Sequence, residues 1–151
     1  MEYTELSGVI KLDFTKKLKE MIREGDYDFI GVDLDERDFS FAGETEKEVK
    51  IHLFSFSKNV DSAEAISEIR NWGFKPITVV ELLAIGAQMP DLQKDWDIIA
   101  LGSDIFGEKV PVLLREISLA DPGDPRRVVA LANRRKIWNT RCRFPAIRTP
   151  C

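Results

Sequence analysis

The sequence pattern is densest in WGFKPITVVELLAIGAQMPDLQKDWDIIALGS, residues 72–103. Thr78 and Glu81 have the spacing of a capping box, in which the threonine hydroxyl accepts from the amide three residues on and the glutamate carboxylate accepts from the threonine amide. Pro76 prevents an earlier helix from continuing into this one. The sequence therefore predicts a helix that begins after Thr78 and ends at Pro90.

The residues after the capping box form two apolar runs. The first covers more than one face of the predicted helix and so indicates burial on most sides: Val80, Leu82, Leu83, Ile85 and Met89. After a polar turn comes the second run, residues 98–101, which is closed by Gly102 and Ser103. Four apolar residues between turn formers predict a buried strand. The whole stretch predicts an extended entry, a capped helix, a turn and a core strand.

The composition is ordinary for one soluble globular domain. The chain has 151 residues, of which 44% are hydrophobic and 32% charged. We expect residues 1–48 to form an N-terminal helix with an extended arm, and residues 49–151 to form the core. No apolar run approaches the ~20 residues that span a bilayer, and the N-terminus lacks the pattern of a secretory signal. These features predict a cytoplasmic protein without a membrane span.

Cysteine and histidine are scarce in this chain. The two cysteines are Cys142 and Cys151, and His52 is the single histidine. Together they are too few soft ligands for a zinc site, and a cysteine at the last position is a poor partner for a structural disulfide. We therefore expect no metal and no cofactor.

The remaining segments predict further helices and strands. A helix is predicted over 14–24, capped by Asp13 or Thr15, and another after Asp61, with Trp72 on its inner face. The turn at 121–125 indicates a hairpin between its flanking strands. Strands are predicted at 49–55, 97–102, 110–116, 127–132 and 142–148, and residues 30–34 have the pattern of a half-exposed strand or extended arm.

Two of these strands are expected at the edges of the sheet. Pro111 cannot donate to a strand ladder, so it favours an edge strand or the start of a strand. The last strand, 142–148, can close the sheet at an edge. Helices early in the chain and short strands joined by turns later predict an α+β domain, with two to three helices and a mainly antiparallel sheet.

Several motifs resemble a group of uncharacterised bacterial proteins. The group has a pattern like K/R-P-A-T-x-x-E-L-L-A-x-G, then I-x-A-L-G-S, and a final C/Y-R-F-x-A-x-R strand. The matching positions here are Lys75 to Thr78, Glu81 to Ala84, Gly86, Ile98 to Ser103 and Cys142 to Arg148. The resemblance covers roughly residues 49–148, and the group carries no activity that can be transferred.

A remoter resemblance is to C-type-lectin-like domains, where an extended R-L-P-T-x-x-E entry leads into the second helix. Residues 138–142, WNTRC, are similar to the W-N-D-x-x-C region of that fold. However, Thr140 stands where a calcium-binding carboxylate would be, and Cys142 comes one residue early. The disulfide framework is also missing. The resemblance therefore implies a fold, without calcium-dependent sugar binding.

Three candidates for catalytic chemistry each have a simpler explanation. Asp33 and Asp35 resemble the D-x-D motif of magnesium-dependent phosphoryl transfer, but Glu36 and Arg37 follow in place of Gly-Thr, so solvated acids at a strand end are favoured. His52 could act as a base, although a partly exposed sheet histidine is the simpler interpretation. Flanking arginines could lower the pKa of Cys142, but an inward-facing small hydrophobe is favoured.

The charge is divided unevenly along the chain. Residues 1–108 contain 12 Lys or Arg against 23 Asp or Glu, whereas residues 109–151 contain 10 against 3, within a net charge of −4. Eight of these basic residues lie within 23 positions, interleaved with Trp138 and Phe144: Arg126, Arg127, Arg134, Arg135, Lys136, Arg141, Arg143 and Arg148. Such a section can bind a polyanion or pair with the acidic half.

The sequence thus favours a non-catalytic binding module. We expect the contact residues to be Arg126, Arg127, Arg134, Arg135, Lys136, Trp138 and Arg141. A protein partner is favoured over nucleic acid because the overall charge of −4 would repel a long polyanion. Nucleic-acid binding through arginine contacts to phosphates is the alternative. A magnesium-dependent phosphoryl-transfer enzyme using Asp33 and Asp35 is a less favoured one.

Overall fold

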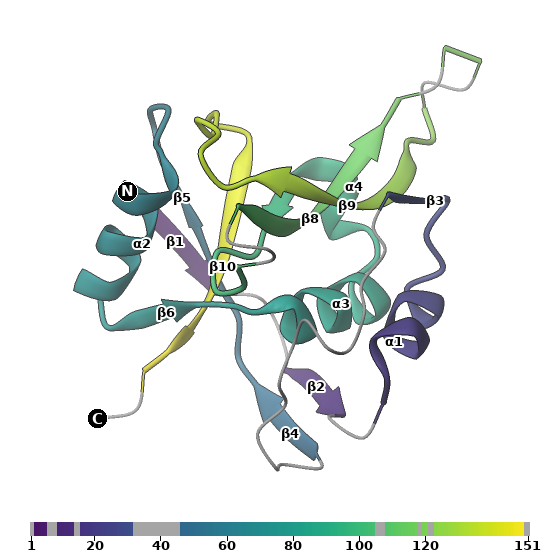
Figure 1. Cartoon of the computed structure of the whole chain (residues 1–151), viewed down its shortest axis with the longest axis horizontal. Helices are drawn as coiled ribbons and strands as arrows, with labels where there is room; N and C mark the ends of the chain where they lie inside the picture. The colour runs from purple at the N-terminus through teal and green to yellow at the C-terminus, as the bar shows by residue number, and fades with distance from the viewer. Residues whose placement is uncertain are drawn as a thin grey trace.

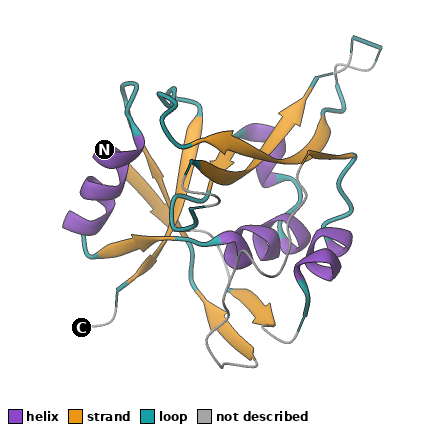
Figure 2. Ribbon diagram, viewed as in Figure 1, coloured by secondary structure: helices purple, strands orange, loops and turns teal. Residues whose placement is uncertain are grey.

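The computed structural model describes residues 2–5, 9–13, 16–31, 46–104, 108–117, 119–120 and 123–149. Within these residues the chain is an α+β protein with a mainly antiparallel sheet, as predicted (Figure 1, Figure 2). The helices are α1 (Leu18–Glu24), α2 (Ser62–Asn71), α3 (Val79–Gln88) and α4 (Leu92–Asp95). The strands are β1 (Glu2–Glu5), β2 (Ile10–Asp13), β3 (Phe29–Gly31), β4 (Glu46–Val49), β5 (His52–Ser55), β6 (Phe74–Pro76), β7 (Asp97–Ile99), β8 (Lys109–Glu116), β9 (Arg126–Asn133) and β10 (Cys142–Arg148).

The large sheet has the strand order β1-β5-β10-β7-β8-β9-β3, and β6 pairs with β10. Neighbouring strands are antiparallel except for the parallel pairs β10–β7 and β3–β9. β2 and β4 form a separate two-stranded sheet. The prediction that 142–148 closes the sheet at an edge is wrong, because β10 is paired with β5, β6 and β7 and lies in the interior.

The expectation of an edge strand at Pro111 is also wrong. β8 lies between β7 and β9, and Pro111 is its third residue. The carbonyl of Pro111 accepts from the amide of Ala100, so its ring nitrogen also faces the β7 side. β7 has already ended at Ile99. The missing N–H therefore falls beyond the last paired residue, where its loss costs little.

The segment 72–103 is held together by hydrogen bonds between its own residues. α3 begins after Thr78 with the predicted capping box, in which the Thr78 amide donates to the Glu81 carboxylate at 3.2 Å. The hydroxyl of Ser103 accepts from the Val79 amide at 2.8 Å and so satisfies another free donor of the first turn. Gly102 must be glycine, because an added Cβ would lie 2.5 Å from the carbonyl oxygens of Pro76 and Ile77.

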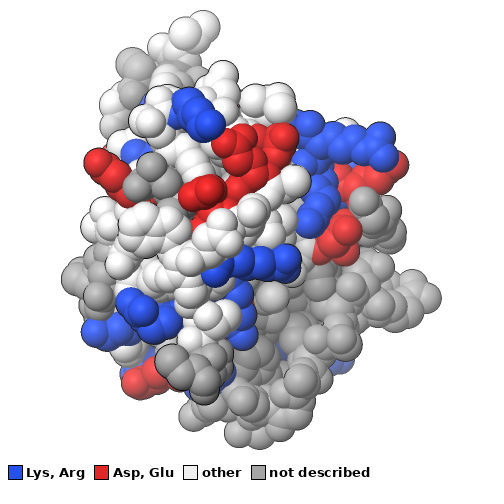
Figure 3. All heavy atoms as spheres, turned by 90° about the vertical axis from the view of Figure 1, so that its left-hand side faces the viewer, with Lys and Arg blue, Asp and Glu red and all other residues white. Residues whose placement is uncertain are grey.

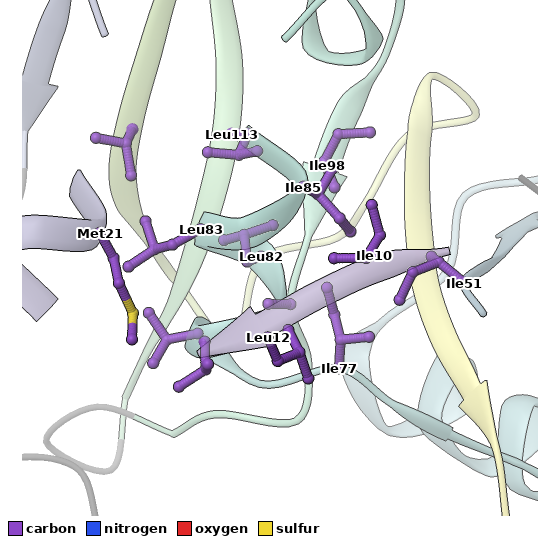
Figure 4. Close-up of a cluster of buried hydrophobic side chains, with 14 of the residues drawn as sticks. Ile10, Leu12, Met21, Ile51, Ile77, Leu82, Leu83, Ile85, Ile98 and Leu113 are labelled. Carbon is purple, nitrogen blue, oxygen red and sulfur yellow. The ribbon is translucent and has the colours of Figure 1, made fainter. Parts of the chain in front are cut away.

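Two hydrophobic clusters form the interior, on opposite sides of the segment 72–103. The first packs α1, α3 and β2 against the sheet, with Ile10, Leu12, Leu83 and Leu113 among its buried residues (Figure 4). The second lies beneath α2 and includes Phe54, Ile69, Trp138 and Phe144. Ile10 and Leu12 are each 3% exposed, so β2 of the N-terminal segment contributes to the first cluster. The expected half-exposed strand or arm at 30–34 overlaps the exposed strand β3 at residues 30–31, and its other residues lie outside the described part of the chain.

Several predicted boundaries need correction. α1 begins at Leu18 after Lys17, Asp13 belongs to β2, and Thr15 lies outside the described residues. The predicted strand 49–55 is divided into β4 and β5, which belong to different sheets. The helix after Asp61 is confirmed with its cap, but it ends at Asn71. Trp72, which follows, is 50% exposed and not on the inner face.

Candidate basic surface

β9 separates the basic residues that are clustered in the sequence. Arg126 and Arg127 begin the strand, and the β9–β10 loop, residues 134–141, follows its last residue Asn133. An extended strand of this length spans roughly 23 Å. Figure 1 shows the β8–β9 hairpin tip and the β9–β10 loop at opposite ends of β9. The predicted contact residues 126–141 therefore do not form one continuous surface.

Arg127 is buried, with 7% of its surface exposed, and its guanidinium donates to main-chain carbonyls. Its Nε donates to the Pro90 carbonyl at 3.1 Å, and its two terminal nitrogens donate to the carbonyls of Gly25, Asp26 and Gly86. Gly25 follows α1, and Gly86 lies in the last turn of α3. The side chain thus satisfies carbonyls that the two helix ends leave free. Arg127 is a structural residue and not the surface contact that was predicted.

The surroundings of Arg127 stabilise its positive charge. Among the described residues, no carboxylate contacts the guanidinium. The C-terminal ends of α1 and α3 point their partial negative charge toward it, and the ring of Tyr27 lies 4.8 Å from the guanidinium carbon. Burial raises the pKa of Tyr27 to about 12, which the charge of Arg127 partly opposes. Tyr27 therefore stays neutral at physiological pH, and its neutral ring contacts the guanidinium of Arg127.

Trp138 is also buried, with 1% exposed, and does not lie on the surface as predicted. Its indole N–H donates to the Ser62 hydroxyl at 2.9 Å, and its backbone forms a β-bridge with Val60. Phe144 packs against it with ring centroids 6.3 Å apart and is equally buried. Neither ring can offer a face on which a base could stack. Trp138 instead anchors the β9–β10 loop to the segment before α2.

The exposed part of the β9–β10 loop carries positive charge beside one apolar side chain. Arg135 and Lys136 are exposed, Arg134 is half-buried, and Ile137 is 57% exposed. The Asn133 side chain accepts from the Arg135 amide at 2.9 Å, which fixes the turn. Among the described residues, these three cations form no ion pair. We call Arg134, Arg135, Lys136 and Ile137 the basic loop surface.

Two arginines that follow are tied to the segment around α4. Arg141 donates to the Asp95 carbonyl at 2.6 Å. The guanidinium carbon of Arg143 lies 3.7 Å from the centre of the Trp96 ring, and burial lowers its pKa. Arg141 is half-buried and lies at the base of the loop, whereas Arg126 is exposed at the far end of β9.

The catalytic candidates do not form a site among the described residues. Burial and the nearby Asp97 raise the pKa of the Cys142 thiol to about 11, so its arginine neighbours do not make it reactive. His52 is 6% exposed and packs against Phe74 with ring centroids 4.8 Å apart, so the expected partial exposure is wrong. Asp33 and Asp35 lie outside the described residues, and the magnesium hypothesis stays a prediction.

The described ranges contain neither a cluster of metal-ligand side chains nor a helix that could cross a membrane. Within them, no three His, Cys, Asp or Glu side chains are grouped so that they could hold a metal ion. No helix among them has the length and apolar character needed to cross a membrane.

A second group of surface residues was not predicted. Tyr3, Trp72 and Arg148 are exposed around the buried ring of Phe74, and they come from three distant parts of the sequence. The one available signal was the end of the helix pattern near Gly73, because a tryptophan just past a helix end can turn outward. We call these three residues the aromatic surface.

Comparisons of this chain with protein-family models, with curated proteins and with solved structures find no match. The resemblances to the uncharacterised bacterial group and to C-type-lectin-like domains therefore stay predictions.

Proposed function

We propose that the protein is a non-catalytic binding module that engages an acidic region of a protein partner through the basic loop surface. The observation that carries this proposal is the exposure of Arg135 and Lys136, which form no ion pair among the described residues, beside the exposed Ile137. Charged side chains of this kind steer a partner of opposite sign, and an apolar residue beside them gains from burial.

The loop is held in one conformation before any partner binds. Its turn is fixed by the Asn133 side chain, and the Asn139 side chain accepts from the Arg141 amide at 3.0 Å. Between these turns Trp138 is buried, and Ser62 donates its hydroxyl to the Arg134 carbonyl at 2.6 Å. A loop fixed in this way loses little conformational entropy on binding, which favours a recognition role.

The burial of the aromatic residues favours a protein partner over nucleic acid. Binding of single strands combines cations with aromatic rings on which bases stack. Trp138 and Phe144 are both buried, so the exposed side chain next to the cations is aliphatic. Arg126 is also too far along β9 to extend the same cationic surface. The remaining cations are few for a long polyanion, yet they suit a small acidic region of a protein.

The proposal is tested by crosslinking from the loop in cells that produce the protein. A photoreactive amino acid at Ile137 is compared with the same group at Lys19, an exposed position on α1. We expect a discrete protein adduct from position 137 that is lost in Arg135→Glu/Lys136→Glu. It should persist in the matched reversal Arg70→Glu/Arg126→Glu, whose two arginines are also exposed.

Nucleic acid is tested in parallel with labelled single- and double-stranded oligonucleotides. Binding that weakens steeply between low and physiological salt, and that is lost in Arg135→Glu/Lys136→Glu, would replace the protein partner by the nucleic-acid alternative. Equal adducts from positions 137 and 19, or an adduct that survives the reversal at 135 and 136, would contradict the proposal.

A further inference from the structure

The aromatic surface is built around one buried ring. Phe74, in β6, is 1% exposed, and its ring centre lies 5.3 Å from that of Tyr3 and 5.1 Å from that of Phe54. The guanidinium carbon of Arg148 lies 4.7 Å from the same ring centre. Tyr3 in turn contacts Trp72 edge to face, at 5.7 Å. Strands β1, β6 and β10 and the end of α2 therefore bring these side chains together.

The outer side chains of this cluster remain accessible. Tyr3 is 39% exposed and Trp72 is 50% exposed, and Arg148 is exposed as well. Their polar ends, a hydroxyl, an indole N–H and a guanidinium, make no hydrogen bond or ion pair to any described residue. Three potential donors thus lie beside two exposed aromatic rings, one of which packs on the buried ring of Phe74. Tryptophan, tyrosine and arginine are also the residue types enriched at the energetic centres of protein interfaces.

We propose that Tyr3, Trp72 and Arg148 form a second docking surface, which takes an extended protein segment with an apolar side chain beside a carboxylate. The apolar side chain packs on the two rings, and the carboxylate pairs with Arg148, which contacts the Phe74 ring but forms no ion pair with a described residue. An extended shape fits because β1 begins the strand order, so its outer edge is open to another strand within the described part of the chain.

The charges nearby favour such a segment over nucleic acid. Figure 3 shows the face that contains α2 and β6, where acidic side chains gather in the upper half, with Lys and Arg side chains above, beside and below them. Glu68 is half-buried, four residues before Trp72, in the last turns of the helix that ends at Asn71. Phosphates would meet these carboxylates, whereas a segment with a single carboxylate can reach Arg148 and avoid them.

The test uses a random peptide library displayed on phage, selected on the full chain. We expect the enriched peptides to share an acidic residue close to an apolar one. Synthetic peptides from the selection should bind Trp72→Ala and Arg148→Gln about 10-fold more weakly than the unchanged protein. Arg126→Gln removes another exposed arginine, at the far end of β9, and should leave their affinity unchanged.

Three further measurements complete the test. The melting temperature of each variant shows whether a weakened affinity reflects loss of the fold, and a folded Arg148→Gln is sufficient if Trp72→Ala is unstable. Enriched peptides that lose affinity in Arg135→Glu/Lys136→Glu and keep it in Arg148→Gln would overturn this inference while supporting the basic loop surface. Peptides without acidic residues, or a labelled oligothymidylate whose binding depends on Trp72, would overturn it as well.

Discussion

Arg127 and Arg135 are the same kind of residue, eight positions apart, and they have opposite roles. Arg127 is buried and donates to the carbonyls at the ends of α1 and α3. Arg135 is exposed on the β9–β10 loop and makes no ion pair with a described residue. The difference shows that a basic run in the sequence does not define a surface, because Arg127 lies within β9 against the ends of α1 and α3, whereas Arg135 lies in the loop beyond the end of the strand.

The strongest test of this contrast is Arg127→Met. The variant leaves the buried carbonyls around Gly25, Gly86 and Pro90 without a donor, so we expect the free energy of unfolding to fall by about 3–5 kcal/mol. Arg135→Met should change it by less than about 0.5 kcal/mol. Urea unfolding of both variants measures the difference. Equal stabilities would mean that the guanidinium is dispensable and that the buried contacts of Arg127 carry little energy.

A smaller effect is expected at Gly86, in the same region. Replacing a glycine inside a helix with alanine usually stabilises it, by roughly 1 kcal/mol. Here an added Cβ would overlap the hydroxyl of Tyr27, which is buried beneath Arg127. We therefore expect Gly86→Ala to destabilise the protein by about 1–3 kcal/mol. Alanine at Gly73 provides a contrast, because that glycine has a φ of +86° and no atom of a described residue within 4 Å of an added Cβ.

The two glycine variants separate two physical causes. At Gly73 the loss of stability would come from left-handed backbone, and at Gly86 from contact with Tyr27. A double variant Gly86→Ala/Tyr27→Phe removes the hydroxyl and should recover part of the stability. A stabilising effect of Gly86→Ala would contradict the close packing of Tyr27 against α3 and the close contacts of Arg127 in the same region.

Local signals in the sequence were sufficient for individual elements. The Thr78–Glu81 capping box, the Asp61 cap and the β8–β9 hairpin are all formed by residues close to one another in the chain. Their chemistry depends on fixed spacings of a few residues, so it can be recognised without a structure. The α+β class then follows from the sum of these elements.

Long-range pairing accounts for what could not be predicted. β10 is interior because β5, β6 and β7, from three separate parts of the chain, pair with it. The burial of Trp138 depends on Ser62, 76 positions earlier, and the aromatic surface depends on Tyr3 reaching Trp72. Residue type correctly marked arginine and tryptophan as informative, but it did not indicate which of them face solvent.

The smallest expected effect on stability is at the basic loop surface, and it completes the comparison with Arg127. Arg135→Glu/Lys136→Glu exchanges two exposed cations that form no ion pair among the described residues, and it removes the contact of the Lys136 ammonium with the Trp138 ring at 5.7 Å. We therefore expect the free energy of unfolding to change by less than about 1 kcal/mol. The exchange should even be slightly favourable at low salt if like charges on the loop repel one another, and added salt should remove that gain.

Because Arg135→Glu/Lys136→Glu is expected to change stability very little, loss of the crosslinked adduct in this variant would report on binding. Urea unfolding at two salt concentrations measures the change in stability, with Arg70→Glu/Arg126→Glu as the matched reversal. A loss as large as that of Arg127→Met would mean that Arg135 and Lys136 support the fold, and loss of a partner in that variant would then carry no information. Stability that is unchanged while the adduct disappears would assign these two side chains to recognition, and the buried arginine at the start of β9 to the fold.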